Sequence, residues 1–300
     1  MSQMNQKKTF PEQWKVYKET IENALDRSLL QIPCRQEKVI EAMRYSLLGG
    51  GKRIRAILVL EFAELGGIPE KQAMPVACAV EMIQAYSLIH DDLPCMDDDA
   101  MRRGKPSCHV QFDEATALLA GDGLLTCSFE TAVQSADYLP ASRVLAVVKK
   151  LSECAGYQGM IGGQVIDLAS EGKKIDEQAL EEMYRLKTGA LLEAACVSGC
   201  LLAGREDEVS SAENYARFLG LAFQIVDDIL DVTGDQSLLG KPVGSDAANQ
   251  KNTFVTLLGM EKSREIAKSY TEKALCQLSK LGVADGFLVN LTNALLNRLQ

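Results

Sequence analysis

The stretch EKQAMPVACAVEMIQAYSLIHDDLPCMDDD, residues 70–99, decides the fold of this chain. From Glu70 to His90 its apolar side chains recur with the period of an α-helix, and between Ala73 and Ile89 most faces of that helix are apolar. A helix with this character lies at the centre of a large bundle or packs on a second subunit as well. We therefore predict a central helix of an all-α fold, in a chain that can form a homodimer.

Helix-like patterns also cover most of the remaining chain, whereas the alternating pattern of β-strands is essentially absent. Glycine and proline residues lie at the joints between these patterns. The predicted helices are Pro11–Leu30, Gln36–Leu48, Arg53–Leu65, Glu70–His90, Asp113–Asp137, Ala141–Ile166, Asp176–Leu202, Ser210–Val232, Lys251–Leu281 and a last one near Ala284–Leu299. Because no low-complexity linker interrupts them, we predict a single domain over residues 1–300, with residues 1–35 as an N-terminal helical segment that packs on it.

Composition narrows the classes of partner. The net charge is −9, and a protein that binds nucleic acid or an anionic membrane is normally basic, so neither partner is expected. The longest weakly charged apolar run, Gly189–Gly204, is too short for a membrane span, so no membrane insertion is expected. The nine cysteines include no CxxC pair and are typical of reduced thiols. With no apolar signal segment in Met1–Phe10, we expect a cytoplasmic protein.

Two clusters of aspartate interrupt the apolar patterns, DDLPCMDDD at residues 91–99 and DDILD at residues 227–231. Burying so much like charge is costly unless a cation neutralises it. Oxygen-only ligands favour a hard cation such as Mg²⁺, which keeps open positions for phosphate oxygens when few carboxylates hold it. The clusters therefore predict a magnesium–diphosphate site between two helices.

The two clusters differ in their expected geometry. Asp227 and Asp231 are four residues apart, so both carboxylates lie on one face of a helix. Their neighbours are apolar, which argues against the alternative of an ordinary solvated charge run. Asp91 and Asp97 are six residues apart and would lie on different sides of an ideal helix. Because Pro94 disrupts the helix between them, we expect the chain to fold back and bring Asp97 beside Asp91.

Three basic strings offer partners for phosphate oxygens. RRGKP at residues 102–106 follows the first cluster directly, and guanidinium groups suit a diphosphate. GGGKRIR at residues 49–55 combines glycines with three cations, although such a string is also common in surface turns. It lacks the spacing of a Walker loop. KTG at residues 187–189 is a weaker signal on its own, and Lys241 follows the second cluster. Together these strings indicate two anionic substrates with apolar tails.

These motifs, in this order, resemble those of the trans-isoprenyl diphosphate synthases, and the chain is most similar to the bacterial-type farnesyl diphosphate synthases. The similarity runs from about residue 36 to the end. It implies an all-α bundle of ten or more helices around a deep central cavity, usually in a homodimer. It also implies prenyltransferase activity, in which isopentenyl diphosphate condenses with dimethylallyl or geranyl diphosphate to give farnesyl diphosphate and pyrophosphate.

The resemblance assigns expected roles to individual residues. Three Mg²⁺ ions are expected at Asp91, Asp97 and Asp227, with Asp92, Asp228 and Asp231 nearby. The expected catalytic set is Asp91, Asp92, Asp97, Arg102, Lys187, Asp227, Asp228 and Lys241. The allylic diphosphate would contact Arg102, Lys187, Thr188, Gln224 and Lys241. Isopentenyl diphosphate would contact Gly51, Lys52, Arg53, Arg55, Gln84 and Arg103. Asp167 also matches a family motif, and Ala56 stands where the family usually has proline.

Product length is expected to depend on Tyr86 and the small residue Ser87. Tyr86 lies five residues before Asp91, about 7.5 Å along the helix, where its ring could block a growing chain. A core aromatic is the alternative role. An orienting role toward Asp91 is open for His90. Geranylgeranyl diphosphate is the alternative product, and a non-catalytic diphosphate-binding subunit or a terpene cyclase is the alternative function.

Overall fold

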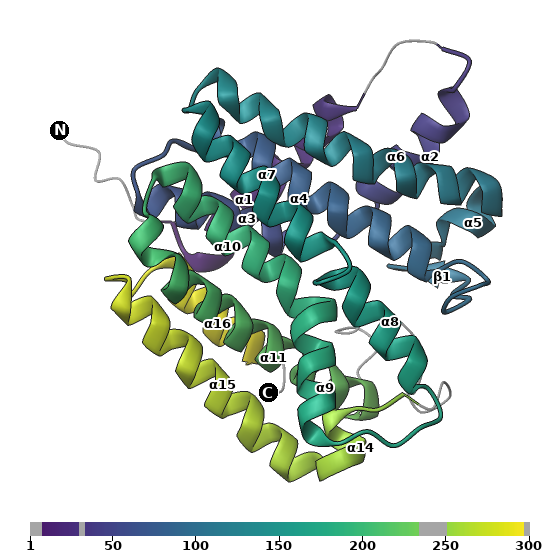
Figure 1. Ribbon diagram of the computed structural model, residues 1–300, viewed down its shortest axis with the longest axis vertical. Coiled ribbons are helices and arrows are strands. Elements are labelled where there is room, and N and C mark those ends of the chain that lie inside the picture. Colours follow the sequence, from purple (N-terminus) through teal and green to yellow (C-terminus); the bar gives the residue numbers. More distant parts are fainter. Residues whose placement is uncertain (1–7, 30–33, 234–250, 297–300) are drawn as a thin grey trace.

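The computed structural model describes residues 8–29, 34–233 and 251–296, and these are helical almost throughout (Figure 1). The α-helices are α1 (Phe10–Ser28), α2 (Glu37–Leu47), α3 (Ile54–Leu65), α4 (Glu70–Asp91), α5 (Cys108–Gln111), α6 (Glu114–Val133), α7 (Ala141–Ala155), α8 (Met160–Ser170), α9 (Glu177–Tyr184), α10 (Ala190–Ala203), α11 (Val209–Thr233), α14 (Phe254–Leu258), α15 (Met260–Lys280) and α16 (Phe287–Leu296). Two strands, β1 (Met101–Arg102) and β2 (Lys105–Pro106), pair as a short antiparallel hairpin. The predicted all-α class is confirmed.

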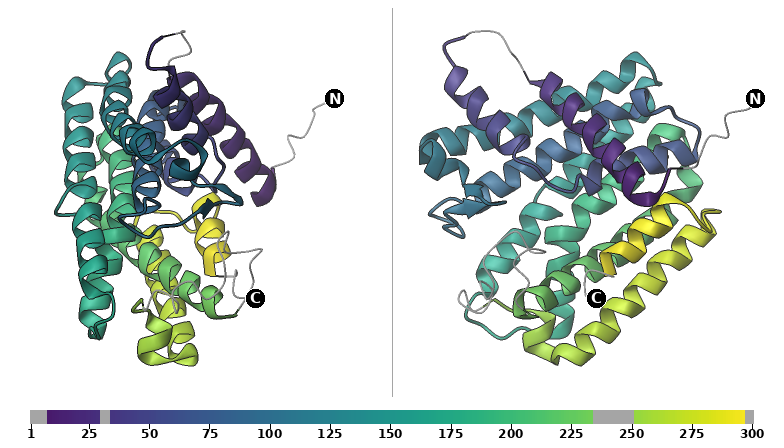
Figure 2. Two further views of the ribbon diagram at one scale, coloured as in Figure 1. Left: turned by 90° about the vertical axis from the view of Figure 1, so that its right-hand side faces the viewer. Right: turned by 180° about the vertical axis from the view of Figure 1, so that it is seen from behind.

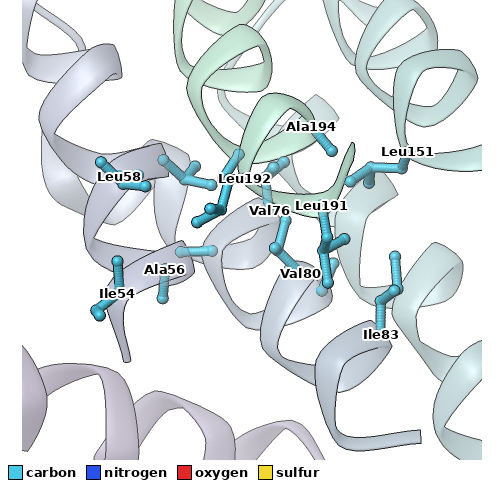
Figure 3. Packing of buried hydrophobic residues seen from close by; sticks show 14 of the residues in the cluster. Ile54, Ala56, Leu58, Val76, Val80, Ile83, Leu151, Leu191, Leu192 and Ala194 are labelled. Atoms are coloured by element: carbon cyan, nitrogen blue, oxygen red, sulfur yellow. The ribbon is translucent and has the colours of Figure 1, made fainter. Parts of the chain in front are cut away.

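The main hydrophobic core lies where α3, α4, α7 and α10 meet (Figure 3). Helices α3 and α10 are buried on nearly every face, as their uniformly apolar sequences require. Gly199 lets them approach closely, because a Cβ atom there would lie 2.5 Å from the Cβ atom of Phe62. The predicted central helix, α4, has most of its length buried in this core.

A second, smaller hydrophobic cluster joins α9, the C-terminal half of α11, α14 and α15. Ile225 and Phe254 are fully or almost fully buried within it. The C-terminal end of α4 belongs to the main core, whereas the second aspartate motif belongs to this cluster. The two aspartate motifs are therefore carried by different packing units.

The N-terminal helix packs on the C-terminal one. Ile21 and Leu25 of α1 are buried in the main core, and the rings of Phe10 and Tyr17 lie 5.0 and 5.2 Å from the ring of Phe287 in α16. Figure 2, seen from behind, shows α1 crossing the bundle beside α16. Aromatic contacts thus join segments from opposite ends of the chain.

Three predicted helices are interrupted in the structure. The stretch predicted as Ala141–Ile166 is two helices, α7 and α8, because the chain turns at Gly156–Gly159. The stretch predicted as Lys251–Leu281 breaks at Gly259, whose φ of +83° is a left-handed conformation that favours glycine. The stretch predicted as Asp176–Leu202 contains a π-helical turn, Arg185–Gly189. In each case an apolar pattern continues across the interruption and conceals it.

The stretch Glu177–Ala203, which contains that π-helical turn, is the one candidate membrane span among the described residues. By length and composition alone it could cross a bilayer, but 72% of its most apolar window is buried inside the protein. Its apolar character is therefore accounted for by its place in the core. All nine cysteines lie in the described ranges and form no disulfide, but Cys95 and Cys276 are exposed.

Candidate active site

The first aspartate motif lies where α4 ends. Asp91 is the last residue of the helix, and the chain then turns so that the backbone N–H of Asp97 donates to the carbonyl oxygen of Asp91 at 2.9 Å. Asp98 takes a left-handed conformation, with φ of +52°. The structure thus has the fold-back that Pro94 predicted, and Asp97 lies beside Asp91.

Charges from distant segments converge on these two carboxylates. Burial raises the pKa of Asp91 to about 6, while nearby Lys187 opposes the increase and Asp97 adds to it. The ammonium group of Lys251 lies 3.3 Å from Oδ2 of Asp97. Lys251 was missed in the sequence, because no motif links it to a residue 154 positions earlier. The cluster is therefore bordered by cations before any ligand is considered.

Asp92 has a different environment from Asp91. It is buried and accepts hydrogen bonds from two Arg102 nitrogens, from Nε at 2.9 and 3.3 Å and from Nη2. Arg102 also lies 3.2 Å from Asp99. Burial raises the pKa of Asp92, and the Arg102 guanidinium opposes this. Asp92 thus orients an arginine that is expected to bind diphosphate.

The hairpin that follows aims Arg102 and Arg103 at different partners. Arg103 and Gly104 form the turn between β1 and β2, and both have positive φ angles, +53° and +76°. This is the combination of a type I′ turn. The Arg103 guanidinium donates to the carbonyl oxygen of Gly50 and covers Gly51, where a Cβ atom would lie 3.1 Å from it. The hairpin therefore brings Arg103 onto the predicted glycine-rich anion loop.

The basic residues of that loop point in different directions. Lys52 is exposed, and its carbonyl oxygen accepts a hydrogen bond from the indole of Trp14. Arg55 is partly buried, and burial lowers its pKa to about 10. Arg53, predicted to contact isopentenyl diphosphate, is only 3% exposed and bonds to Glu81 and to the carbonyl oxygen of Leu47. Its guanidinium lies in the core behind the loop and does not reach the surface where a ligand would bind, contrary to the prediction.

The third basic motif lies on the π-helical turn Arg185–Gly189. A π-turn adds one residue to a helix and often occurs at functional sites. Lys187 donates to Asp167 of α8 at 2.5 Å, and Thr188 donates to Gln224 of α11 at 3.0 Å. The turn packs closely on α8, because a Cβ atom at Gly163 would lie 2.2 Å from the backbone nitrogen of Lys187. Lys187 and Thr188 are thus positioned by two neighbouring helices.

The second aspartate motif lies within the uninterrupted helix α11. Asp227 is partly buried, and Asp231 is buried one turn further along the same face. Asp228 is 2% exposed and accepts hydrogen bonds from the Tyr184 hydroxyl at 2.7 Å and from the backbone N–H of Phe254 at 3.1 Å. Asp228, predicted as a catalytic residue, therefore joins α11 to α9 and α14.

The last turns of α4 carry the residues predicted to bind isopentenyl diphosphate and to limit product length. Gln84 and Ser87 are partly buried, and the Ser87 hydroxyl donates to the carbonyl oxygen of Gln84 at 3.0 Å. Tyr86 is 5% exposed and its hydroxyl has no hydrogen-bond partner among the described residues. Its ring packs edge-on against His90 at 5.7 Å. His90 Nε2 lies 3.1 Å from the carbonyl oxygen of Leu118, so it is directed at α6 and does not orient Asp91.

The expected metal site depends on a ligand as well as on the protein. In the described ranges, no three His, Cys, Asp or Glu side chains are close enough to hold a metal by themselves. Asp91, Asp97 and Asp227 nevertheless offer only carboxylate oxygens, the ligands that Mg²⁺ prefers. A diphosphate would supply the remaining oxygen ligands, so the residues fit a metal that arrives with its substrate. Lys241, also predicted for this site, lies outside the described residues.

The chain is similar to known proteins over most of its length. The family model described as polyprenyl synthetase matches residues 36–281. The chain is 46% identical over 267 residues to the heterodimeric geranylgeranyl pyrophosphate synthase large subunit 1 of Arabidopsis thaliana, covering 87% of this chain and 71% of that protein. It is 41% identical over 285 residues to the farnesyl diphosphate synthase of Bacillus subtilis, covering 94% and 95%.

Among solved structures, the chain is similar to a geranyltransferase from Helicobacter pylori complexed with magnesium and isoprenyl diphosphate. The TM-score is 0.85 at 32% sequence identity, and the match covers 98% of this chain and 99% of the other. The geranylgeranyl synthase of Arabidopsis and the farnesyl synthase of Bacillus, whose products differ in length, are thus similar to this chain at comparable identity.

Proposed function

Because the chain belongs to the polyprenyl synthetase family and is a short-chain trans-prenyltransferase, we propose that its product is (E,E)-farnesyl diphosphate. The substrates would be isopentenyl diphosphate and dimethylallyl or geranyl diphosphate. The observation that supports the condensation of two diphosphates is the pairing of a carboxylate cluster with two separate cationic groups, whereas the C15 length rests on Tyr86. One group, which includes Lys187 and Lys251, borders the aspartates, and the other, which includes Arg55 and Arg103, borders the glycine loop.

The allylic diphosphate would bind at the aspartates. Asp91, Asp97 and Asp227 would hold Mg²⁺, and oxygens of the diphosphate would be the other ligands of the metal. Three ions are expected when diphosphate is bound. Bound Mg²⁺ supplies charge neutralisation on the leaving diphosphate. Arg102, Lys187, Thr188 and Lys251 would donate to the same oxygens, and Gln224 and Lys241 belong to the proposed set. These donors stabilise negative charge that grows as the allylic carbon–oxygen bond breaks.

The second diphosphate would bind at the glycine loop, near Gly51, Lys52, Arg55, Gln84 and Arg103. Holding isopentenyl diphosphate there brings its double bond to the allylic carbocation, and proximity of this kind lowers the barrier substantially. The double bond's electron pair forms the new carbon–carbon bond. A proton then leaves the adjacent carbon for the released pyrophosphate, and the electrons of that carbon–hydrogen bond form the new double bond. No side-chain base is needed.

Tyr86 is the proposed limit on product length. Its ring is buried one and a half turns before Asp91, and its hydroxyl makes no hydrogen bond within the described residues, so its contribution is one of shape. Ser87 beside it is small. Geranylgeranyl diphosphate is the second candidate product, because a geranylgeranyl synthase is among the similar relatives.

A product assay tests this proposal. Purified protein is incubated with isopentenyl diphosphate, geranyl diphosphate and Mg²⁺, and the products are separated by chain length. We expect mainly C15 product from the wild type and from Tyr86→Phe, which keeps the ring, and longer products from Tyr86→Ala. A mainly C20 product from the wild type would contradict the assignment. Turnover of the allylic substrate without use of isopentenyl diphosphate would instead favour a cyclase.

A homodimer is part of the proposal. Seven large hydrophobic side chains are exposed on the consecutive helices α6, α7 and α8, and on α8 they recur along one stripe. They are Leu118, Leu119, Val133, Leu145, Ile161, Val165 and Leu168. A stripe of this kind is expected where a second subunit packs. We also propose that residues 1–300 act as one domain in the cytoplasm.

A further inference from the structure

Glu81 is a buried carboxylate that the proposed reaction does not use. It lies in the middle of α4, one turn before Gln84, and is 5% exposed. A carboxylate at such a position is costly unless charged and hydrogen-bonding partners compensate for it. The partners of Glu81 therefore indicate what it does.

The hydrogen-bond donors to Glu81 among the described residues lie at the start of α3. Its Oε2 atom accepts from Nη1 of Arg53 at 3.2 Å, and its Oε1 atom accepts from the backbone N–H of Ala56 at 3.2 Å. Arg53 in turn donates to the carbonyl oxygen of Leu47 at 2.8 Å. One carboxylate thus connects α4 to the end of α2, to the glycine loop and to the first turn of α3.

The start of α3 needs this support. Arg53 precedes the helix with φ of +56°, a conformation that costs an L-residue free energy. The amide of Ala56 is one of the first-turn N–H groups that have no partner within the helix. Residue 56 is alanine and not proline, so it has an N–H group to donate. Glu81, on the neighbouring helix α4, accepts a hydrogen bond from that group. It therefore acts as a cap for α3.

The same carboxylate faces the arginines expected to receive the second diphosphate. The Nε atom of Arg55 is buried and has no hydrogen-bond partner among the described residues. Burial lowers the pKa of Arg55, Glu81 opposes that decrease, and Arg103 adds to it. Burial also lowers the pKa of Arg103, and Arg53 adds to that decrease while Glu81 opposes it. Glu81 is the negative charge that these three guanidiniums have in common.

We propose that Glu81 is a positioning residue for the isopentenyl diphosphate pocket. It holds Arg53 and the first turn of α3 in place, and so fixes the position of Arg55 and of the glycine loop without touching the substrate. This role rests on the proposed function, because it requires that the arginine cluster be an anion site.

The kinetic test uses Glu81→Gln, which keeps an oxygen acceptor for the Ala56 amide but removes the charge. The KM for isopentenyl diphosphate should rise about tenfold, whereas the KM for geranyl diphosphate and kcat should stay within about twofold. Glu193→Gln is the matched control, because it breaks a different partly buried ion pair, with Lys150 at 2.6 Å, that joins α7 to α10. It should leave both KM values unchanged.

A double variant covers the case in which Glu81→Gln alone does not fold. Arg53→Gln combined with Glu81→Gln leaves no unpaired buried charge from this pair. If Glu81 acts through Arg53, the double variant should also raise the KM for isopentenyl diphosphate about tenfold, and where the single variant folds the two increases should be equal. A folded single or double variant with an unchanged KM, or with equal increases for both substrates, would overturn the role of Glu81.

A binding experiment separates this role from the proposed function. Inorganic diphosphate is titrated in EDTA by calorimetry, since binding without metal reports the arginine and lysine donors. Glu81→Gln should weaken this binding about tenfold. If the wild type binds diphosphate but does not consume isopentenyl diphosphate, the proposed function fails. The positioning role then depends on whether Glu81→Gln binds diphosphate more weakly than the wild type. If the wild type does not bind diphosphate under these conditions, the positioning role is wrong.

Discussion

The ammonium group of Lys187 lies between two carboxylates of different kinds. It donates to buried Asp167 and is close enough to Asp91 to oppose the increase in its pKa. Because a cation at this position stabilises the charge that grows on the leaving diphosphate, Lys187→Gln should lower kcat/KM for geranyl diphosphate by about 10²–10³-fold. Lys173→Gln, at an exposed lysine near the end of α8, is the control. A loss of less than about threefold for Lys187→Gln would remove it from the proposed site.

Glu61 gives a prediction for the pH dependence of stability. Burial raises its pKa to about 7, although the Tyr17 hydroxyl donates to it at 2.5 Å. A carboxyl group whose pKa is higher in the folded protein than in the unfolded chain binds more protons when folded, so stability falls as pH rises from about 4.5 to about 7. Glutamine does not ionise, so the Glu61→Gln variant does not lose stability in this way. The unfolding free energy of Glu61→Gln relative to wild type should rise by about 1–2 kcal/mol between pH 5 and pH 8, measured by urea denaturation. A difference that does not change with pH would contradict this.

The sequence was informative about residues whose motifs are local. Asp91, Asp97 and the fold-back between them follow from spacing and from Pro94. Lys251 could not be predicted, because its contact with Asp97 depends on how two distant segments pack. The inward direction of Arg53 could not be predicted either. A basic residue in a basic string gives no sign that a buried glutamate on another helix is its partner.

Gly163 is where helix α8 meets the π-helical turn. A Cβ atom there would lie within 2.2–2.6 Å of backbone atoms of Lys187, which cannot move aside as a flexible side chain could. Gly163→Ala should therefore destabilise the protein by about 2–3 kcal/mol and displace Lys187. We expect a lower melting temperature by calorimetry together with a large loss of prenyltransferase activity.

The control is Gly282→Ala, at a glycine with a positive φ of +78° where an added Cβ atom would have no neighbour within 4 Å. It should cost about 1 kcal/mol of stability through backbone strain alone, with activity unchanged. If Gly163→Ala were active in proportion to its folded fraction, the close packing would matter for stability only.

The sequence predicted most helices and their order, because long apolar patterns fix helix existence well. It did not predict where a helix bends or gains a residue. The turn at Arg185–Gly189 changes no hydrophobic pattern, since both α9 and α10 remain buried on either side of it. Its position is decided by packing against α8 and α11, which spacing within one segment does not report.

Association of two copies gives a prediction for the assembly. Val165 of α8 is 60% exposed, and the stripe it shares with neighbouring residues is not covered by any described residue of the single chain. Val165→Glu places a charge on that stripe and should convert a dimer to a monomer, measured by sedimentation velocity. Val16→Glu on α1, at a valine that is 40% exposed, should leave the mass unchanged. A wild type that sediments as a monomer would contradict the homodimer.

The π-helical turn also sets a rule for chain length. The turn holds one residue more than a regular α-helix would, so deleting one residue between Tyr184 and Ala190 would let the segment close into a regular helix with α9 and α10 nearly in place. Leu191 and Ala194 would stay in the core that buries them. Lys187 and Thr188, however, would lose the positions that the turn gives them beside Asp167 and Gln224. A one-residue gap here in an alignment of related chains should therefore mark chains that keep the fold but lack this arrangement of the lysine and threonine.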